Sequence, residues 1–232
     1  MDYRITDEVS DPAGADRWYR ERLLRMLRPQ WCYTPRDDIP ERLSSGSKRH
    51  SNGTVFGCMT RFMKISNDCA DLWIALLRAS SDTRLRLIDV PNHHRAKTVM
   101  RRFESAGLSG RIEYWPTQDG DAYWRSFQEI DIALDPFPYN GGTTSMDCLW
   151  MGVPVVTLAG VCGASRSAAS ILHGLAFPEL IADRGEQFVA MARDLAADPA
   201  RLSNLHSRLR AQMKQSILCN AQEFTQELEK MM

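Results

Sequence analysis

The chain has 232 residues, enough for one substantial α/β domain or two small ones. Hydrophobic residues make up 44% and charged residues 25%, as is typical of a folded protein with a packed core. Lys and Arg together number 29, and so do Asp and Glu, so the formal net charge is zero. Because nucleic acids and anionic membranes both attract a basic excess, this balance argues against either as the main partner.

The six cysteines form no CxxC pair and no metal-ligand spacing, so they predict small core residues in a reducing compartment and no metal site. The first ten residues, MDYRITDEVS, are polar and acidic, unlike a signal peptide. No apolar run approaches the roughly 18 residues that a membrane span requires. The sequence therefore predicts a cytoplasmic protein.

Residues 1–50 differ in pattern from the rest. Apolar residues recur at helical spacing over Trp18–Leu27. Residues 34–53 are rich in Pro, Ser, Gly and charge, which indicates a linker. We therefore expect a lead-in helix and linker over 1–50, followed by one domain over 51–232.

From Thr54 onward, short apolar runs alternate with amphipathic stretches. The alternation repeats at about 25–30 residues, which predicts right-handed βαβ units and a Rossmann-like parallel sheet with helices on both faces. The expected strands are Thr54–Gly57, Arg84–Val90, Arg111–Trp115, Asp131–Leu134, Pro154–Leu158 and a weak one at Glu179–Ala182. The expected helices are Asp68–Ala79, His94–Gly107, Gly120–Glu129, Thr143–Met151, Ser165–Gly174, Gly185–Ala197, Arg201–Gln215 and Ala221–Met232.

Ligands of such a sheet bind beyond the carboxyl ends of its strands, at the switch point. With the strand order 3-2-1-4-5-6, the first and fourth strands flank that point. The loop after the fourth strand contains Gly141 and Gly142, which let a ligand approach the backbone closely. Thr143 and Thr144 then begin a helix, whose free amides and positive end make an anion site suited to a diphosphate.

Asp147 follows on the same helical face, where it could accept hydrogen bonds from a ribose diol. An ordinary capped helix explains the same residues equally well, with Thr143 as the cap and Asp147 favouring the helix N-terminus. The segment alone leaves both interpretations open.

The loop after the first strand lacks the GxGxxG motif of dinucleotide-binding folds, which argues against a dehydrogenase. It supplies two cations instead, Arg61 and Lys64. A lysine that meets the diphosphate across the switch point would stabilise a departing nucleotide without a metal. The alternative is that both are solvated loop charges.

These residues together resemble the family of O-GlcNAc transferases and plant SPINDLY-type protein O-glycosyltransferases. The resemblance implies a GT-B fold, in which two Rossmann-like lobes enclose the active site, and it makes this chain the C-terminal, nucleotide-sugar-binding half. The stretches that carry it are Phe56-Gly57, Lys64-Ile65, Asp131–Asp135, Asn140–Asp147, Leu149–Thr157, Ala164–Ser170 and Pro178–Ile181, with Asp2–Asp7 in support.

The resemblance implies roles for several residues. Lys64 would contact the diphosphate and assist its departure, as the catalytic residue of this half. Thr143 and Thr144 would hold the phosphates, with Gly141 and Gly142 beside them. Asp147 would bind the ribose.

The base would be recognised by the loop at Thr117 and Gln118, largely through backbone groups. Two positions depart from the animal enzymes. Arg61 stands where those enzymes have a glutamine beside the α-phosphate, and Tyr123 stands where a histidine commonly lies beside the base.

The implied reaction is the inverting, metal-independent transfer of N-acetylglucosamine from UDP-GlcNAc to Ser or Thr of a protein acceptor, with no cofactor. GDP-fucose, as in the SPINDLY branch, is the rival donor. The N-terminal lobe and the tetratricopeptide repeats of the family are absent from this sequence, so we expect a partial chain. A donor-binding module without activity of its own is therefore a further alternative, and an NAD-binding domain is a distant one.

Overall fold

The central element of the protein is a six-stranded parallel sheet. The computed structural model describes residues 1–36, 39–40, 53–89 and 94–231, with the side chains of 94 and 95 left out. The strand order is β5-β4-β3-β6-β7-β8, which is the 3-2-1-4-5-6 order on which the expected place of the site depends. Neighbouring β3 and β6 therefore flank the switch point, where the connections diverge to the two halves of the sheet. The strands are β3 (Thr54–Cys58), β4 (Thr83–Leu87), β5 (Ile112–Tyr114), β6 (Ile132–Leu134), β7 (Val155–Leu158) and β8 (Ile181–Ala182).

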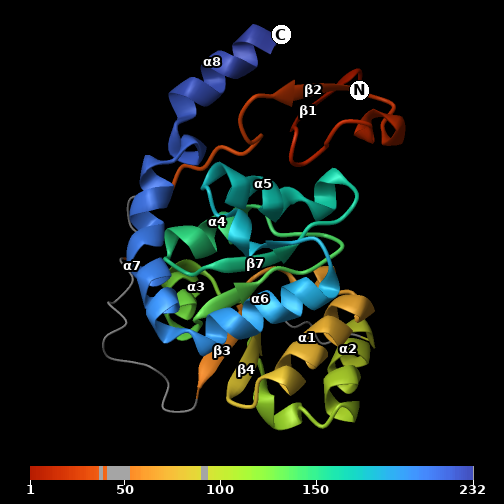
Figure 1. The fold of residues 1–232 in the computed structure, drawn as a ribbon, viewed down its shortest axis with the longest axis vertical. Helices are drawn as coiled ribbons and strands as arrows, with labels where there is room; N and C mark the ends of the chain where they lie inside the picture. The colour runs from red at the N-terminus through yellow and green to blue at the C-terminus, as the bar shows by residue number, and fades with distance from the viewer. Residues whose placement is uncertain (37–38, 41–52, 90–93, 232) are drawn as a thin grey trace.

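Helices cover both faces of this sheet, as expected. Figure 1 shows α4 and α5 on one side of β7 and α6 on its other side, with α1 and α2 beside β4. Fully buried side chains from both layers, such as Trp73 of α1 and Leu149 of α4, pack with Phe56 of β3 in one core. The helices are α1 (Asn67–Ala79), α2 (His94–Ser105), α3 (Gly120–Ser126), α4 (Thr143–Trp150), α5 (Ser167–Gly174), α6 (Gly185–Ala197), α7 (Pro199–Gln215) and α8 (Ala221–Met231).

The expected lead-in helix is wrong. Residues Ala15–Trp18 form a single 3-10 turn, and Arg22–Met26 form strand β2, which pairs in parallel with β1 (Tyr3–Asp7). Pairing with a strand some twenty residues away overrides the local helical spacing, because β1 offers β2 a full set of backbone partners. The expected linker at 34–53 lies mostly outside the described residues, and the division into 1–50 and 51–232 remains a prediction.

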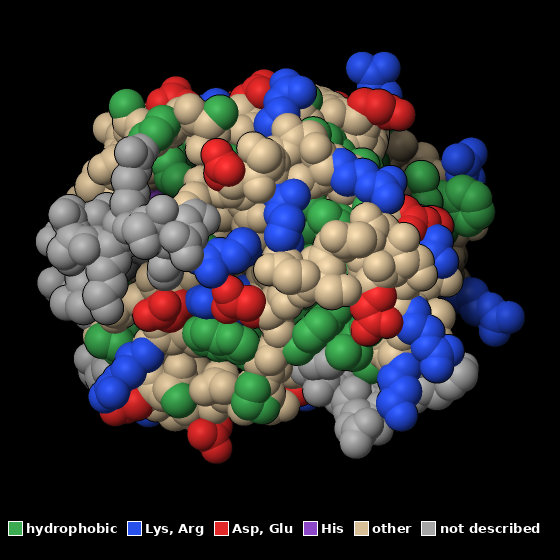
Figure 2. All heavy atoms as spheres, turned by 90° about the horizontal axis from the view of Figure 1, so that it is seen from below, with side chains coloured by type: hydrophobic (Ala, Val, Ile, Leu, Met, Phe, Trp, Pro, Cys, Tyr) green, Lys and Arg blue, Asp and Glu red, His purple; other side chains and the backbone are tan. Residues whose placement is uncertain are grey.

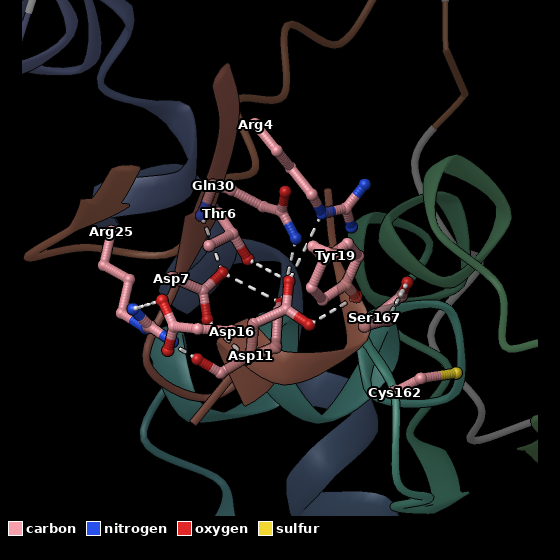
Figure 3. Close-up of polar contacts among 12 residues, drawn as sticks. Arg4, Thr6, Asp7, Asp11, Asp16, Tyr19, Arg25, Gln30, Cys162 and Ser167 are labelled. Carbon is pink, nitrogen blue, oxygen red and sulfur yellow. Dashed lines mark hydrogen bonds and ion pairs between the residues drawn. The ribbon is translucent and has the colours of Figure 1, made fainter. Parts of the chain in front are cut away.

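The β1–β2 pair lies beside α8, near both chain ends (Figure 1). A polar cluster on the loop after β1 joins it to α5. The buried Asp7 carboxylate accepts the Ser170 hydroxyl at 2.8 Å, and Arg166 Nε donates to the Val9 carbonyl at 2.6 Å. In Figure 3 Asp11, also fully buried, lies between Thr6 and Tyr19, whose hydroxyls each donate to it at 2.6 Å.

The surface carries both signs of charge. At the end of the molecule opposite β1 and β2, Figure 2 shows Lys and Arg interspersed with Asp and Glu. Within the described ranges, no helix has the length and apolar character needed to cross a membrane.

Candidate functional site

The segment from Asp135 to Gly142, here called the switch loop, connects β6 to α4 at the switch point. The Asp135 carboxylate is 2% exposed; its Oδ1 accepts the Gly141 N–H at 2.7 Å and its Oδ2 accepts the Thr157 hydroxyl at 2.7 Å. A Cβ on Gly141 would lie 2.2 Å from Ser145 Oγ, so the turn requires a glycine here for lack of space. The sequence pattern led us to expect that Gly141 leaves room for a ligand. In the structure the space beside it is taken by Ser145 and Asp135 of the same fold.

The start of α4 offers free amides. The N–H groups of Ser145 and Met146 both donate to the Gly142 carbonyl, at 3.0 and 3.1 Å. Over the described part of the chain, the amides of Thr143 and Thr144 make no hydrogen bond. Unbonded amides at the positive end of a helix dipole are suited to an anion, and the binding of a diphosphate here stays a prediction.

Lys64 reaches the switch loop from the 3-10 turn Phe62–Lys64 that follows β3. Its Nζ donates to the Asn140 carbonyl at 2.7 Å and lies 4.0 Å from the centre of the Tyr139 ring. Burial lowers the pKa of the Lys64 ammonium, while the charge of Asp135 opposes that effect. Arg61 is exposed, and as a nearby like charge it also lowers this pKa. The structure therefore brings Lys64 to the loop, and its contact with a diphosphate stays a prediction.

Asp147 is held by two tyrosines. The Tyr33 hydroxyl donates to Oδ1 at 2.8 Å and the Tyr123 hydroxyl donates to Oδ2 at 2.7 Å. Burial raises the pKa of this carboxyl, and the two hydroxyl donors work in the opposite direction. Tyr123, expected beside the base, thus lies against the residue expected to bind the ribose, and a ribose diol would share Asp147 with both phenols or displace one.

Thr117 and Gln118 lie at the same edge of the sheet, beyond β5. Thr117 is exposed and Gln118 is half-buried, and their side chains bond locally, Thr117 Oγ1 to Asp89 Oδ1 and Gln118 Nε2 to the Pro116 carbonyl. These bonds do not reach α4, which follows β6 on the other side of β4 and β3 in the sheet. Recognition of a base there remains a prediction.

Three residues of the site were missed in the sequence. Asp135 carried a usable signal, because it is an ionisable residue directly after a buried strand at the switch point. Trp31 and Tyr33 carried none, since their contacts lie over a hundred residues away. A Cβ on Gly142 would lie 2.6 Å from the Trp31 ring, and Tyr33 is 114 residues from Asp147.

A large hollow lies away from this site. It has a volume of about 1020 Å³ and is lined at the amino ends of the strands by residues such as Asp82, Asp131 and His206. None of the predicted site residues borders it. Ligands of doubly wound sheets bind at the opposite edge, so we place the functional site at the switch loop.

Known proteins resemble both the sequence and the fold. The SPINDLY protein of Arabidopsis thaliana, named as a probable UDP-N-acetylglucosamine–peptide N-acetylglucosaminyltransferase, is 33% identical over 99% of this chain and 25% of its own length. The corresponding transferase of Caenorhabditis elegans is 30% identical over 75% of this chain and 15% of its own. The chain thus spans about a quarter of the length of its plant relatives.

Solved structures agree. A mutant of the Thermobaculum terrenum O-GlcNAc transferase superposes with a TM-score of 0.88 at 34% identity, over 99% of this chain and 44% of that one. A sucrose-phosphate synthase from Thermosynechococcus elongatus, at 15% identity and a TM-score of 0.69, shares the fold alone. The fold is that of a GT-B glycosyltransferase lobe. The sequence pattern of the family described as Glycosyl transferase family 41 matches residues 43–228. The chain therefore belongs to glycosyl transferase family 41.

Proposed function

We propose that this chain is the donor-binding part of a protein O-glycosyltransferase that transfers N-acetylglucosamine from UDP-GlcNAc to Ser or Thr of a protein. One observation carries the proposal: the unbonded amides of Thr143 and Thr144 begin α4 at the loop that also holds Lys64. Two free N–H groups at the positive end of a helix, together with a lysine cation at the same loop, suit a nucleoside diphosphate.

The proposed chemistry needs charge stabilisation more than proton transfer on this side of the cleft. As the bond between the sugar and the β-phosphate breaks, negative charge grows on the departing diphosphate. Lys64 and the amides of α4 stabilise that charge without a metal ion. Asp147 binds the ribose, and the Thr117–Gln118 loop binds the base.

Support for the donor class comes from the relatives, which are named as N-acetylglucosaminyltransferases. The chain spans only part of each of them, so the groups that bind and activate the acceptor would belong to another lobe. We therefore propose a donor-binding role for the chain itself, in a transferase that is completed elsewhere.

Titration calorimetry with UDP and GDP tests this proposal. We expect UDP to bind, with the same affinity when a chelator is present, and Thr144→Ala to weaken it about tenfold, since a hydrogen bond to a charged group is worth roughly 1.5–3 kcal/mol. Thr225→Ala, an exposed threonine of α8, serves as the matched control and should change nothing.

Each other outcome has a meaning. Tighter binding of GDP would favour GDP-fucose, the rival donor. Unchanged affinity in Thr144→Ala would exclude a bond from the Thr144 hydroxyl to the diphosphate, since alanine keeps the backbone N–H. Binding that depends on added magnesium or manganese would contradict the metal-free site.

A further inference from the structure

Asp135 is an ionisable residue at a buried position where it accepts hydrogen bonds from Gly141 and Thr157. Its carboxylate is buried directly after β6, and burial raises its pKa to about 7 although the hydrogen bonds from Gly141 and Thr157 favour the anion. A neutral side chain of the same shape could accept the Gly141 bond at a lower desolvation cost. The charge therefore calls for a reason outside packing.

A single peptide group supplies that reason. The carbonyl of the peptide between Asn140 and Gly141 accepts Lys64 Nζ at 2.7 Å, and the N–H of the same peptide donates to Asp135 at 2.7 Å. A peptide group has a dipole of about 3.5 D. The cation meets its negative end and the anion its positive end, so both charges hold the peptide in one orientation.

We propose that Asp135 is a positioning residue of the donor site, which fixes the Asn140–Gly141 peptide and acts through it, and through its own charge, on Lys64. This inference rests on the proposed function, in which Lys64 meets the diphosphate. Asp135 itself is buried at the first position of the switch loop, where it accepts hydrogen bonds from Gly141 and Thr157.

The other ionisable groups near Asp135 are neutral. Its charge acts on three thiols, Cys58 of β3, Cys69 of α1 and Cys148 of α4. Burial raises the pKa of each thiol, that of Cys58 to about 11, so all three stay protonated around pH 7. Among the described residues, Lys64 is the charged side chain whose pKa depends on the charge of Asp135.

The titration of Lys64 itself tests the proposal. In the full chain with ¹³C-labelled lysine, the Cε signal of Lys64 reports its protonation. Asp135→Asn should increase the acid dissociation constant of Lys64 about tenfold or more, because a close opposite charge is lost. Asp131→Asn is the control. The Asp131 carboxylate lies at the opposite end of β6, where it accepts the Val55 N–H at 2.8 Å, so its loss should leave the pKa of Lys64 unchanged. Equal titration of Lys64 in the folded wild type and Asp135→Asn would overturn the proposal.

A second arm remains informative even if Asp135→Asn does not fold. In the wild type the Lys64 signal should show a step around pH 7 as Asp135 titrates. Thr157→Val removes one donor from the anion and should move that step to higher pH. A Lys64 signal without a step, in both proteins, would rule the coupling out.

Nucleotide binding separates this inference from the proposed function. With Asp135→Asn, UDP affinity should fall at a lower pH than in the wild type, since Lys64 loses its proton earlier. A wild type that binds neither UDP nor GDP would count against the proposed function, while the Lys64 titration would still decide the role of Asp135.

Discussion

Gly141 shows how much one hydrogen atom matters at the switch loop. A methyl group there would meet Ser145 Oγ at 2.2 Å and Asp135 Oδ1 at 3.0 Å. We expect Gly141→Ala to distort the loop, lower the free energy of unfolding by about 1–3 kcal/mol, as overpacking does, and weaken UDP binding more than tenfold. The matched control is Gly110→Ala, where a Cβ meets nothing within 4 Å. Chemical denaturation and calorimetry on both variants measure the two effects, and an unaltered Gly141→Ala would contradict this geometry.

The pH dependence of stability isolates the cost of the Asp135 charge. Its pKa is raised in the fold, to about 7, so its contribution to stability is fully present below the unfolded pKa near 4 and is lost as pH rises through 7. The free energy of unfolding of Asp135→Asn, relative to that of the wild type, should therefore rise by at most about 4 kcal/mol between pH 4 and 7. Above pH 7 the difference should stay constant. Denaturation of both proteins across this range measures the difference. A constant difference would show that Asp135 does not titrate there.

At the scale of elements, Asp7 anchors the β1–β2 pair. Its carboxylate accepts the backbone N–H groups of Ser10 and Gln30, at 2.7 and 2.9 Å, besides the Ser170 hydroxyl. Asp7→Ala leaves these donors without their acceptor, which costs about 1–3 kcal/mol for each buried group. We expect faster hydrogen exchange across β1 and β2, with β3 to β7 unchanged, and no effect of Asp2→Ala, an exposed residue. Unchanged exchange in Asp7→Ala would assign the anchoring to other contacts.

The elements also show what could be predicted from the sequence. Strands such as β3 and β7 are short buried apolar runs between amphipathic helices, so local pattern was enough to find them. The strand order, and with it the switch point, came from the usual topology of such sheets, which this sheet follows. Strand β2 could not be found from local pattern, because its conformation depends on β1, which carries no local signal of a partner. In the same way, Thr143, Thr144 and Lys64 could be proposed as site residues from their loops, whereas the bond from Tyr33 to Asp147 spans 114 residues and could not be predicted.

For the whole molecule we expect donor binding without efficient transfer. Positioning of acceptor and donor can be worth roughly 7–11 kcal/mol, and the described residues form no second α/β lobe to supply it. Several of the exposed apolar residues belong to the β1–β2 region, such as Tyr3 (54% exposed), Trp18 (64%) and Leu27 (100%), and they offer a further lobe a surface on which to dock. Fusion to an N-terminal lobe of a related enzyme should therefore restore transfer of radiolabelled sugar to a Ser-rich and Thr-rich peptide.

Within that fusion, Lys64→Ala should reduce turnover more than donor affinity, because the charge that Lys64 meets grows as the bond breaks. Lys214→Ala, an exposed lysine of α7, is the control. Efficient transfer by the 232-residue chain alone would contradict the need for a second lobe. A fully active Lys64→Ala fusion would remove Lys64 from the mechanism.

The polypeptide passes twice between the sheet domain and the β1–β2 and α8 end of the molecule, and the two passages run together. Arg28 donates to the carbonyls of Ile217 and Asn220, and the Tyr33 N–H donates to the Leu218 carbonyl at 2.7 Å. The bonds from Ser170 and Arg166 to the β1 region add a third attachment on another side of that end. Three separate attachments oppose rotation about any one of them, so a lobe that docks on β1 and β2 would keep a fixed orientation relative to the sheet.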